Sequence, residues 1–406
     1  MAERLTGRER VLCALRHEEG DRVPIDFGAF RSSGIHAGTY ARLRRHLGLP
    51  ALRPRLYDLM QQLAEPDDDI KERFHADVEQ VHQRAPSFGI PIDRWKEGVL
   101  PDGTPVMVPA AFDPVELPDG SREIREGSTA IARMTSGGLY FDRVHFPLAA
   151  AESEADLDRL CAWETYTPED LEFIRAQAER LRAGDRAVLF CFGGNILEGG
   201  QGLMGYQDYM CSLAGNPALV RAIGERLAAM YIENLKQVLP LIDGLVDIIA
   251  CGDDLGLQRG LQLSLEDYRA LIKPYHRAVF GYIREHSRAY LFLHSCGAIA
   301  DLLPDLIEVG VQIINPVQVS AKGMEPERLK REFGRHLTFW GGGCDTQAVL
   351  PHGSPAEVRE EVRRRMRVFK PGGGFVFTQV HNILDLVPPE NVAAMYAAAY
   401  EAAAYP

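Results

Sequence analysis

The feature that most limits the folds open to this chain is a regular alternation of short apolar segments and longer amphipathic ones over residues 187–404. The short segments are rich in aliphatic and aromatic residues, which is typical of buried strands. Parallel strands need crossover connections of a dozen or more residues, and these are usually helices. The expected strands are 187–192, 245–251, 289–294, 311–314, 337–340 and 374–378, and the expected helices are 216–238, 265–286, 299–308, 326–333, 355–369 and 389–404.

The segment before residue 50 adds a helix at 7–17, a strand at 22–27 and a helix at 37–47. Six strand–helix units after residue 186, with one or two before it, come close to the eight of a closed barrel. No Gly-x-Gly-x-x-Gly motif follows the first expected strand, and no Walker-type loop is present, so a nucleotide-binding doubly wound sheet is disfavoured. We therefore expect an α/β fold of (β/α)8 TIM-barrel type with an N-terminal helical extension.

Residues 87–148 break this alternation. They contain short alternating runs and two Pro-Asp-Gly turns, at 101–103 and 118–120, which are typical of hairpins. We expect an inserted β-meander here, within a single domain that spans 1–406. Its role is left open by the sequence.

Composition excludes several classes of partner. The formal net charge of −12 argues against nucleic-acid or anionic-membrane binding, because both need a basic surface. No uninterrupted apolar stretch suggests a signal peptide or a membrane span, so we expect a cytoplasmic protein. The seven cysteines are an odd number spread over a long chain, which is not a disulfide framework.

Three metal-capable side chains follow expected strands. His294 and Cys296 are two residues apart, which places both on one face of an extended segment, and Cys344 follows the strand at 337–340. One imidazole and two thiolates suit Zn²⁺, and three protein ligands leave one coordination position open, as in catalytic zinc sites. The alternative from spacing alone is that these are unrelated buried thiols and a hydrogen-bonded histidine.

Four other polar residues at strand ends are candidate proton donors or acceptors: Glu198, Asp253, Asp254 and His381. Asp253 and Asp254 are adjacent and point in opposite directions on a strand, so one is expected to face the site as an acid, a base or a fourth ligand while the other caps the next helix. The alternative left open is that both are loop or cap residues. Glu198 and His381 are equally compatible with ordinary surface or rim contacts.

Several motifs carry a family resemblance over nearly the whole chain. They are RVLCALRHEEGDRVPIDFG at 10–28, GDDLGLQ at 252–258, LHSCG at 293–297, INPVQ at 314–318, FWGGGCDTQAVLPHGSP at 339–355 and HNILDLVPPENVAAM at 381–395. With them the chain resembles the uroporphyrinogen decarboxylase superfamily, and within it the branch of zinc- and cobamide-dependent methyltransferases. The resemblance implies a (β/α)8 barrel and a His-x-Cys…Cys zinc site at His294, Cys296 and Cys344.

The decarboxylase branch fits less well. It has an arginine-rich loop near the N-terminus that binds the tetrapyrrole carboxylates, whereas the corresponding loop here, GAFRSSGIHAGTY, has the single Arg31. A substrate with eight carboxylates calls for several arginines. Decarboxylases of this family use no metal, which leaves the two cysteines unexplained.

The resemblance thus implies a corrinoid-dependent methyltransferase, the O-demethylase component that moves a methyl group from a small O-methyl compound, such as a methoxylated aromatic, to the cobalt of a separate corrinoid protein. A methylcobamide:thiol methyltransferase would carry the same metal site, and a uroporphyrinogen-type decarboxylase or a structural zinc site are further alternatives. The methyl donor, the fourth zinc ligand and the oligomeric state are left open by the sequence.

Overall fold

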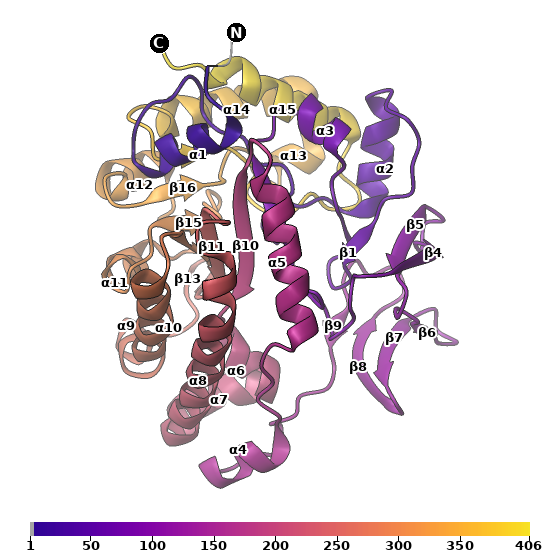
Figure 1. Ribbon diagram of the computed structural model, residues 1–406, viewed down its shortest axis with the longest axis vertical. Coiled ribbons are helices and arrows are strands. Elements are labelled where there is room, and N and C mark those ends of the chain that lie inside the picture. The colour runs from indigo at the N-terminus through magenta and orange to yellow at the C-terminus, as the bar shows by residue number, and fades with distance from the viewer. Residues whose placement is uncertain (1–3) are drawn as a thin grey trace. The chain divides into compact units, whose positions relative to one another are not determined.

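The computed structural model describes residues 4–406 (Figure 1). These residues form two compact units. Of the described residues, the terminal unit contains residues 4–145, Gly184–Ala187 and Thr338–Pro406, and the central unit contains Phe146–Ala183 and Val188–Leu337. Each unit contains parallel strands alternating with helices, and the fold is a TIM-barrel-like α/β fold, as the sequence predicts.

The central unit is built on four neighbouring parallel strands. Leu189 pairs with Ile248, Ile248 with Tyr290, and Phe292 with Ile313, so the strands follow one another in chain order. Their side chains are almost all buried, as expected for strands covered on both faces. Each strand lies within a few residues of the expected one, and β10 belongs to the central unit from Val188 onward. The strands are β10 (Ala187–Gly193), β11 (Ile248–Gly252), β14 (Tyr290–His294) and β15 (Ile313–Asn315).

Helices of the central unit fill the connections between these strands, and Figure 1 shows α8 and α10 side by side. The short β12 (Gly256–Leu257) and β13 (Gly260–Leu261) form a hairpin after β11. The expected helix 265–286 is interrupted by a π-helical turn at Tyr268–Ile272. The helices are α4 (Glu154–Leu160), α5 (Pro168–Arg182), α6 (Leu197–Met204), α7 (Tyr206–Gly215), α8 (Pro217–Ile242), α9 (Leu265–Asp267), α10 (Lys273–His286), α11 (Leu303–Glu308) and α12 (Pro326–Phe333).

The terminal unit supplies the remaining parallel segments. In β16 (Thr338–Trp340) and β17 (Phe375–Val376), Phe339 pairs with Phe375, and Ile25 bridges to Phe377 in parallel. The strand expected at 22–27 is wrong in extent, because only isolated bridges form there. Pro24 has no N–H to donate, so it contributes only its carbonyl, which accepts from the Phe377 N–H.

Among the other elements of the terminal unit, α14 (Pro355–Phe369) has the bounds of the helix expected at 355–369. Ser354 is the N-cap residue of α14, and its side chain forms a capping box with Glu357. The elements are α1 (Gly7–Leu15), α2 (Ala37–His46), β1 (Leu56–Asp58), β2 (Leu63–Ala64), α3 (Asp68–Arg73), β3 (Val78–Val81), α13 (Val349–His352), α14 (Pro355–Phe369) and α15 (Pro389–Ala403).

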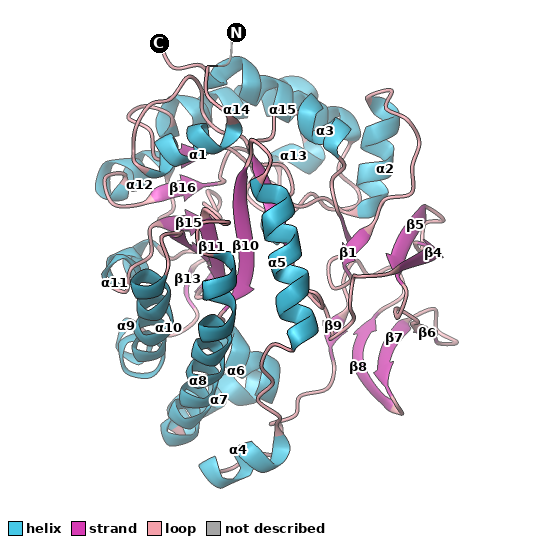
Figure 2. Ribbon diagram, viewed as in Figure 1, coloured by secondary structure: helices cyan, strands magenta, loops and turns pink. Residues whose placement is uncertain are grey.

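The β-rich region of the terminal unit is two antiparallel sheets rather than one meander (Figure 2). A hairpin pairs β4 (Trp95–Val99) with β5 (Pro105–Pro109), and a separate sheet has the order β6-β7-β8-β9. Ile124, Ala132, Met134 and Phe141 form a buried apolar cluster on the second sheet. The second sheet consists of β6 (Val115–Glu116), β7 (Arg122–Glu126), β8 (Thr129–Met134) and β9 (Asp142–Arg143).

Among the helices of residues 4–406, none is long and apolar enough to cross a membrane.

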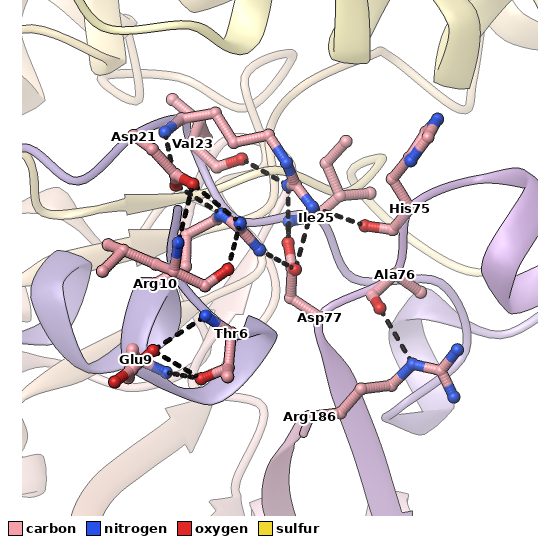
Figure 3. A network of polar contacts seen from close by, with 12 residues as sticks. Thr6, Glu9, Arg10, Asp21, Val23, Ile25, His75, Ala76, Asp77 and Arg186 are labelled. Carbon is pink, nitrogen blue, oxygen red and sulfur yellow. Dashed lines mark hydrogen bonds and ion pairs between the residues drawn. The ribbon is translucent and has the colours of Figure 1, made fainter. Parts of the chain in front are cut away.

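A buried network of charges holds the start of the chain in the terminal unit (Figure 3). Arg10 contacts Asp21 at 2.8 Å and Asp77 at 2.6 Å, and Arg22 contacts Asp77 at 2.7 Å. The Ile25 N–H also donates to Asp77, at 2.8 Å. Both arginine side chains are only 1% exposed, so the pairs compensate charges that water does not reach.

This network predicts a stability that falls in acid. Burial works to raise the pKa of Asp21, but hydrogen bonds from Arg10 and from the Arg4 and Leu5 N–H groups outweigh it and hold that pKa well below its ordinary value. The resulting stabilisation is complete above the unfolded-state pKa, about 4, and is lost as the pH falls below it. We expect Asp21→Asn to lower the melting temperature at pH 6 and to flatten its decline between about pH 4 and pH 2. An unchanged acid slope in this variant would contradict the assignment.

Candidate metal and catalytic site

His294 and Cys296 lie together at the carboxyl end of β14 in the central unit. The strand is apolar up to Leu293, and His294 is its last residue. Because side chains alternate along an extended chain, Ser295 points away and Cys296 returns to the side of His294. The His294 Nε2 and Cys296 Sγ atoms are 3.4 Å apart.

A glycine keeps the segment after Cys296 close to its neighbour. Gly297 has φ of +91°, and a Cβ there would lie 2.3 Å from the backbone of Gly256. Its N–H donates to the Gln318 side chain at 2.8 Å. A side chain at 297 would therefore push the Cys296 loop away from the β12–β13 hairpin.

Asn315 fixes the orientation of the His294 ring. It ends β15 directly beside His294 in the strand register, and its Oδ1 lies 2.7 Å from His294 Nδ1. An amide oxygen only accepts, so Nδ1 carries the proton and Nε2 presents its lone pair on the side of Cys296. This is the arrangement that partners of metal-binding histidines commonly impose.

The two adjacent aspartates have different partners. Asp254 Oδ1 accepts the Cys296 N–H at 2.7 Å and lies 3.6 Å from His294 Nε2, so Asp254 faces the candidate metal ligands. Asp253 is fully buried and accepts the N–H groups of Ile196, Leu197 and Glu198 at the start of α6. Asp253 therefore caps a helix, and Asp254 is the one at the site.

Glu198 is held beside Asp254. Its Oε2 accepts the Asp254 N–H at 2.9 Å and the Asn195 amide at 2.8 Å. Burial, together with the charges of Asp254 and Asp253, raises the pKa of Glu198 to about 8. The carboxyl group is therefore mostly protonated at neutral pH and is suited to donate a proton.

The Cys296 thiol is neutral in the metal-free protein. Burial raises its pKa well above the ordinary value, and the nearby Asp254 carboxylate adds to the effect. A thiol in such surroundings is a poor nucleophile, and it becomes a thiolate when a metal ion replaces its proton.

Cys344 and His381 belong to the terminal unit. Cys344 follows β16, is fully buried, and has its Sγ 3.8 Å from Glu361 Oε2. Burial and then the Glu361 charge raise the pKa of Cys344. His381 Nδ1 lies 2.5 Å from Asn382 Oδ1. The roles of Cys344 as a ligand and of His381 as a proton donor stay predictions.

The central unit thus brings together four of the residues singled out in the sequence, His294, Cys296, Asp254 and Glu198. Sequence reasoning missed Asn315, although it stands at the end of an expected strand and inside a quoted motif. It also missed His276, which lies within a helix that no motif marks.

The donor atoms of the central unit fit a zinc ion. A tetrahedral site with one Zn–N bond and one Zn–S bond places nitrogen and sulfur about 3.5 Å apart. The observed 3.4 Å between His294 Nε2 and Cys296 Sγ agrees with that edge. The tautomer set by Asn315 directs the correct lone pair, so the pair is preorganised for a soft divalent metal.

Comparisons with known proteins give a consistent family. A model described as uroporphyrinogen decarboxylase (URO-D) matches residues 145–402. A uroporphyrinogen decarboxylase of Methylococcus capsulatus is 24% identical over 264 residues, which cover 63% of this chain and 67% of that protein. A solved methyltransferase from Methanosarcina mazei has a similar fold, with a TM-score of 0.59 and 16% identity over 98% of this chain and 99% of that one. Because the family model matches more than half of the chain, this protein belongs to the uroporphyrinogen decarboxylase (URO-D) family.

Proposed function

We propose that this protein is a zinc-dependent methyltransferase, the O-demethylase component of a corrinoid system. It takes the methyl group of a small O-methyl compound, such as a methoxylated aromatic, and passes it to the cobalt of a corrinoid carried by a partner protein. His294, Cys296 and Cys344 are the proposed ligands, Cys344 on the sequence resemblance.

The observation that carries this proposal is the His294–Cys296 pair. Its donor atoms are 3.4 Å apart at the end of β14, and Asn315 orients the imidazole from behind. Parallel α/β folds place their active sites at the carboxyl ends of strands. A metal-free decarboxylase needs no such soft donor pair.

Bound zinc would polarise the ether oxygen as a Lewis acid. The residues of the chain supply the remaining requirements. When the methyl–oxygen bond breaks, the departing oxygen needs a proton, and the Glu198 carboxyl holds one because its pKa is raised to about 8. Asp254 holds Cys296 in place through the Cys296 N–H.

Decarboxylation of a uroporphyrinogen is the second candidate, favoured by the 24% identity to the Methylococcus capsulatus enzyme. Arg31 is the single arginine of the N-terminal loop, and its guanidinium is already engaged by the buried Asp58 carboxylate and the Pro86 carbonyl. This leaves little cationic surface in the loop for a substrate with many carboxylates.

The test is an assay of the zinc-loaded protein with a reduced corrinoid protein and a panel of methoxyarenes. We expect a free phenol and methylated corrinoid in equal amounts from at least one substrate, and neither from Cys296→Ala. Methyl transfer from methylated corrinoid to a thiol, without phenol release, would support the thiol methyltransferase instead. Release of CO₂ from uroporphyrinogen would overturn the proposal.

Asn315 offers a prediction for metal affinity. Asn315→Ala removes the acceptor for His294 Nδ1–H, so the ring loses its fixed orientation, and we expect zinc to bind about 10–100-fold more weakly. Competition with a zinc-chelating dye measures this change. The matched control is Asn234→Ala, because Asn234 is also buried in the central unit but accepts the Tyr166 N–H. Equal zinc affinities in the two variants would exclude the orienting role.

A further inference from the structure

We infer that Tyr268, His276 and Asp253 form a chain of positioning residues that holds the Glu198 carboxyl in place for proton transfer. The role assigned to Glu198 rests on the proposed function, whereas the chain itself is defined by the contacts below. Of the three, Asp253 also contacts a candidate metal ligand through its backbone, because the Asp253 N–H donates to the His294 carbonyl at 2.8 Å.

The chain begins in the helical segment behind the site. The Tyr268 hydroxyl lies 3.1 Å from His276 Nδ1, and His276 Nε2 lies 2.9 Å from Asp253 Oδ2. All three residues are fully buried, and the ring of Phe280 stacks on His276 with centroids 4.7 Å apart. The Asp253 oxygen accepts, so in the neutral ring Nε2–H donates to Asp253 and Nδ1 is left to accept the phenol O–H, which Tyr268 keeps because burial raises its pKa well above the ordinary value.

The π-helical turn accounts for the first contact. In a regular α-helix two residues eight positions apart are rotated by about 80° from each other, so their side chains diverge. The wider turn at Tyr268–Ile272 changes this rotation, and Tyr268 and His276 meet. Single π turns inside helices occur often at functional sites, and here the turn has an identifiable consequence.

The second part of this chain of contacts is a pair of hydrogen bonds, one in each direction, between the segment after β11 and the start of α6. Asp253 Oδ1 accepts the Glu198 N–H at 2.8 Å, and the Glu198 side chain accepts the Asp254 N–H at 2.9 Å. Asp253 Oδ2 accepts the Leu197 N–H at 2.8 Å and also lies 2.9 Å from His276 Nε2. A shift of Asp253 therefore moves the backbone of Glu198 and loosens its side-chain contact with Asp254.

This arrangement explains a buried carboxylate and a buried imidazole that the proposed mechanism does not use. A helix cap alone needs only a short polar side chain. The additional histidine and tyrosine fix the direction of the Asp253 carboxylate, which is what a precisely placed proton donor requires.

The experiment compares Tyr268→Phe and His276→Gln with the control Tyr275→Phe. Tyr275 lies on α10 beside His276, and Tyr275→Phe removes one hydrogen bond, to the Arg221 carbonyl at 2.9 Å, that does not lead to Asp253. We expect amide hydrogen exchange at 196–198 to become about 5–10-fold faster in the first two variants and to stay unchanged in the control. We also expect kcat for methyl transfer to fall about 10-fold, with KM and zinc content unchanged.

The outcomes separate the two proposals. Faster exchange at 196–198 with reduced kcat supports the positioning chain. Exchange or kcat in Tyr268→Phe equal to that in Tyr275→Phe would overturn it, even if His276→Gln fails to fold. If the wild-type protein transfers no methyl group at all, the proposed function fails, and the exchange rates alone decide whether the chain holds α6.

Discussion

Replacing Cys296 by alanine is expected to remove zinc from the purified protein. The variant removes the sulfur atom that lies 3.4 Å from His294 Nε2, and loss of a direct ligand exceeds the 10–100-fold effect of losing a ligand's supporting contact. We therefore expect affinity to fall by more than about 100-fold. Metal analysis after dialysis should give about one zinc per wild-type chain and almost none in the variant.

Cys211→Ala is the matched control for this experiment. Cys211 is an exposed free cysteine of the same unit, on α7. Its replacement should leave the zinc content unchanged. Retention of zinc by Cys296→Ala would remove Cys296 from the ligand set, and with it the observation on which the proposed function rests.

The second large effect concerns folding. Asp77→Asn removes the charge that faces Arg10 and Arg22 in the terminal unit, and both arginines stay buried. Removing one partner from a buried charge network costs about 3–5 kcal/mol, and in this variant Asp21 is left as the carboxylate that balances two buried guanidinium groups. We expect the apparent free energy of unfolding in urea to fall by that amount.

The control for Asp77→Asn is an exposed ion pair of the same unit. Arg16 and Glu18 lie 2.9 Å apart, but their side chains are 46% and 56% exposed. Glu18→Gln should therefore change the free energy of unfolding by less than about 0.5 kcal/mol. A similar loss in both variants would show that burial of the network does not matter.

Much of the fold was predictable because its signals are local. The segment Tyr290–His294 is short and apolar, which indicates a buried strand without reference to the rest of the chain. The segment Pro355–Phe369 has helical periodicity and a capping box, which indicate a helix in the same local way. The strand at 22–27 failed because hydrogen bonding there depends on Phe377, some 350 residues away, and on a proline that cannot donate.

The candidate site divides in the same way. That His294 and Cys296 share a face follows from the sequence alone, because side chains two positions apart lie on the same side of an extended segment. It did not distinguish Asp253 from Asp254, which have the same chemistry and adjacent positions. Contacts in the folded protein distinguish the two: Asp253 faces His276 and the start of α6, while Asp254 faces Cys296. Partners that arrive from other helices and strands set these roles, as they set the raised pKa of Glu198, and no local pattern encodes them.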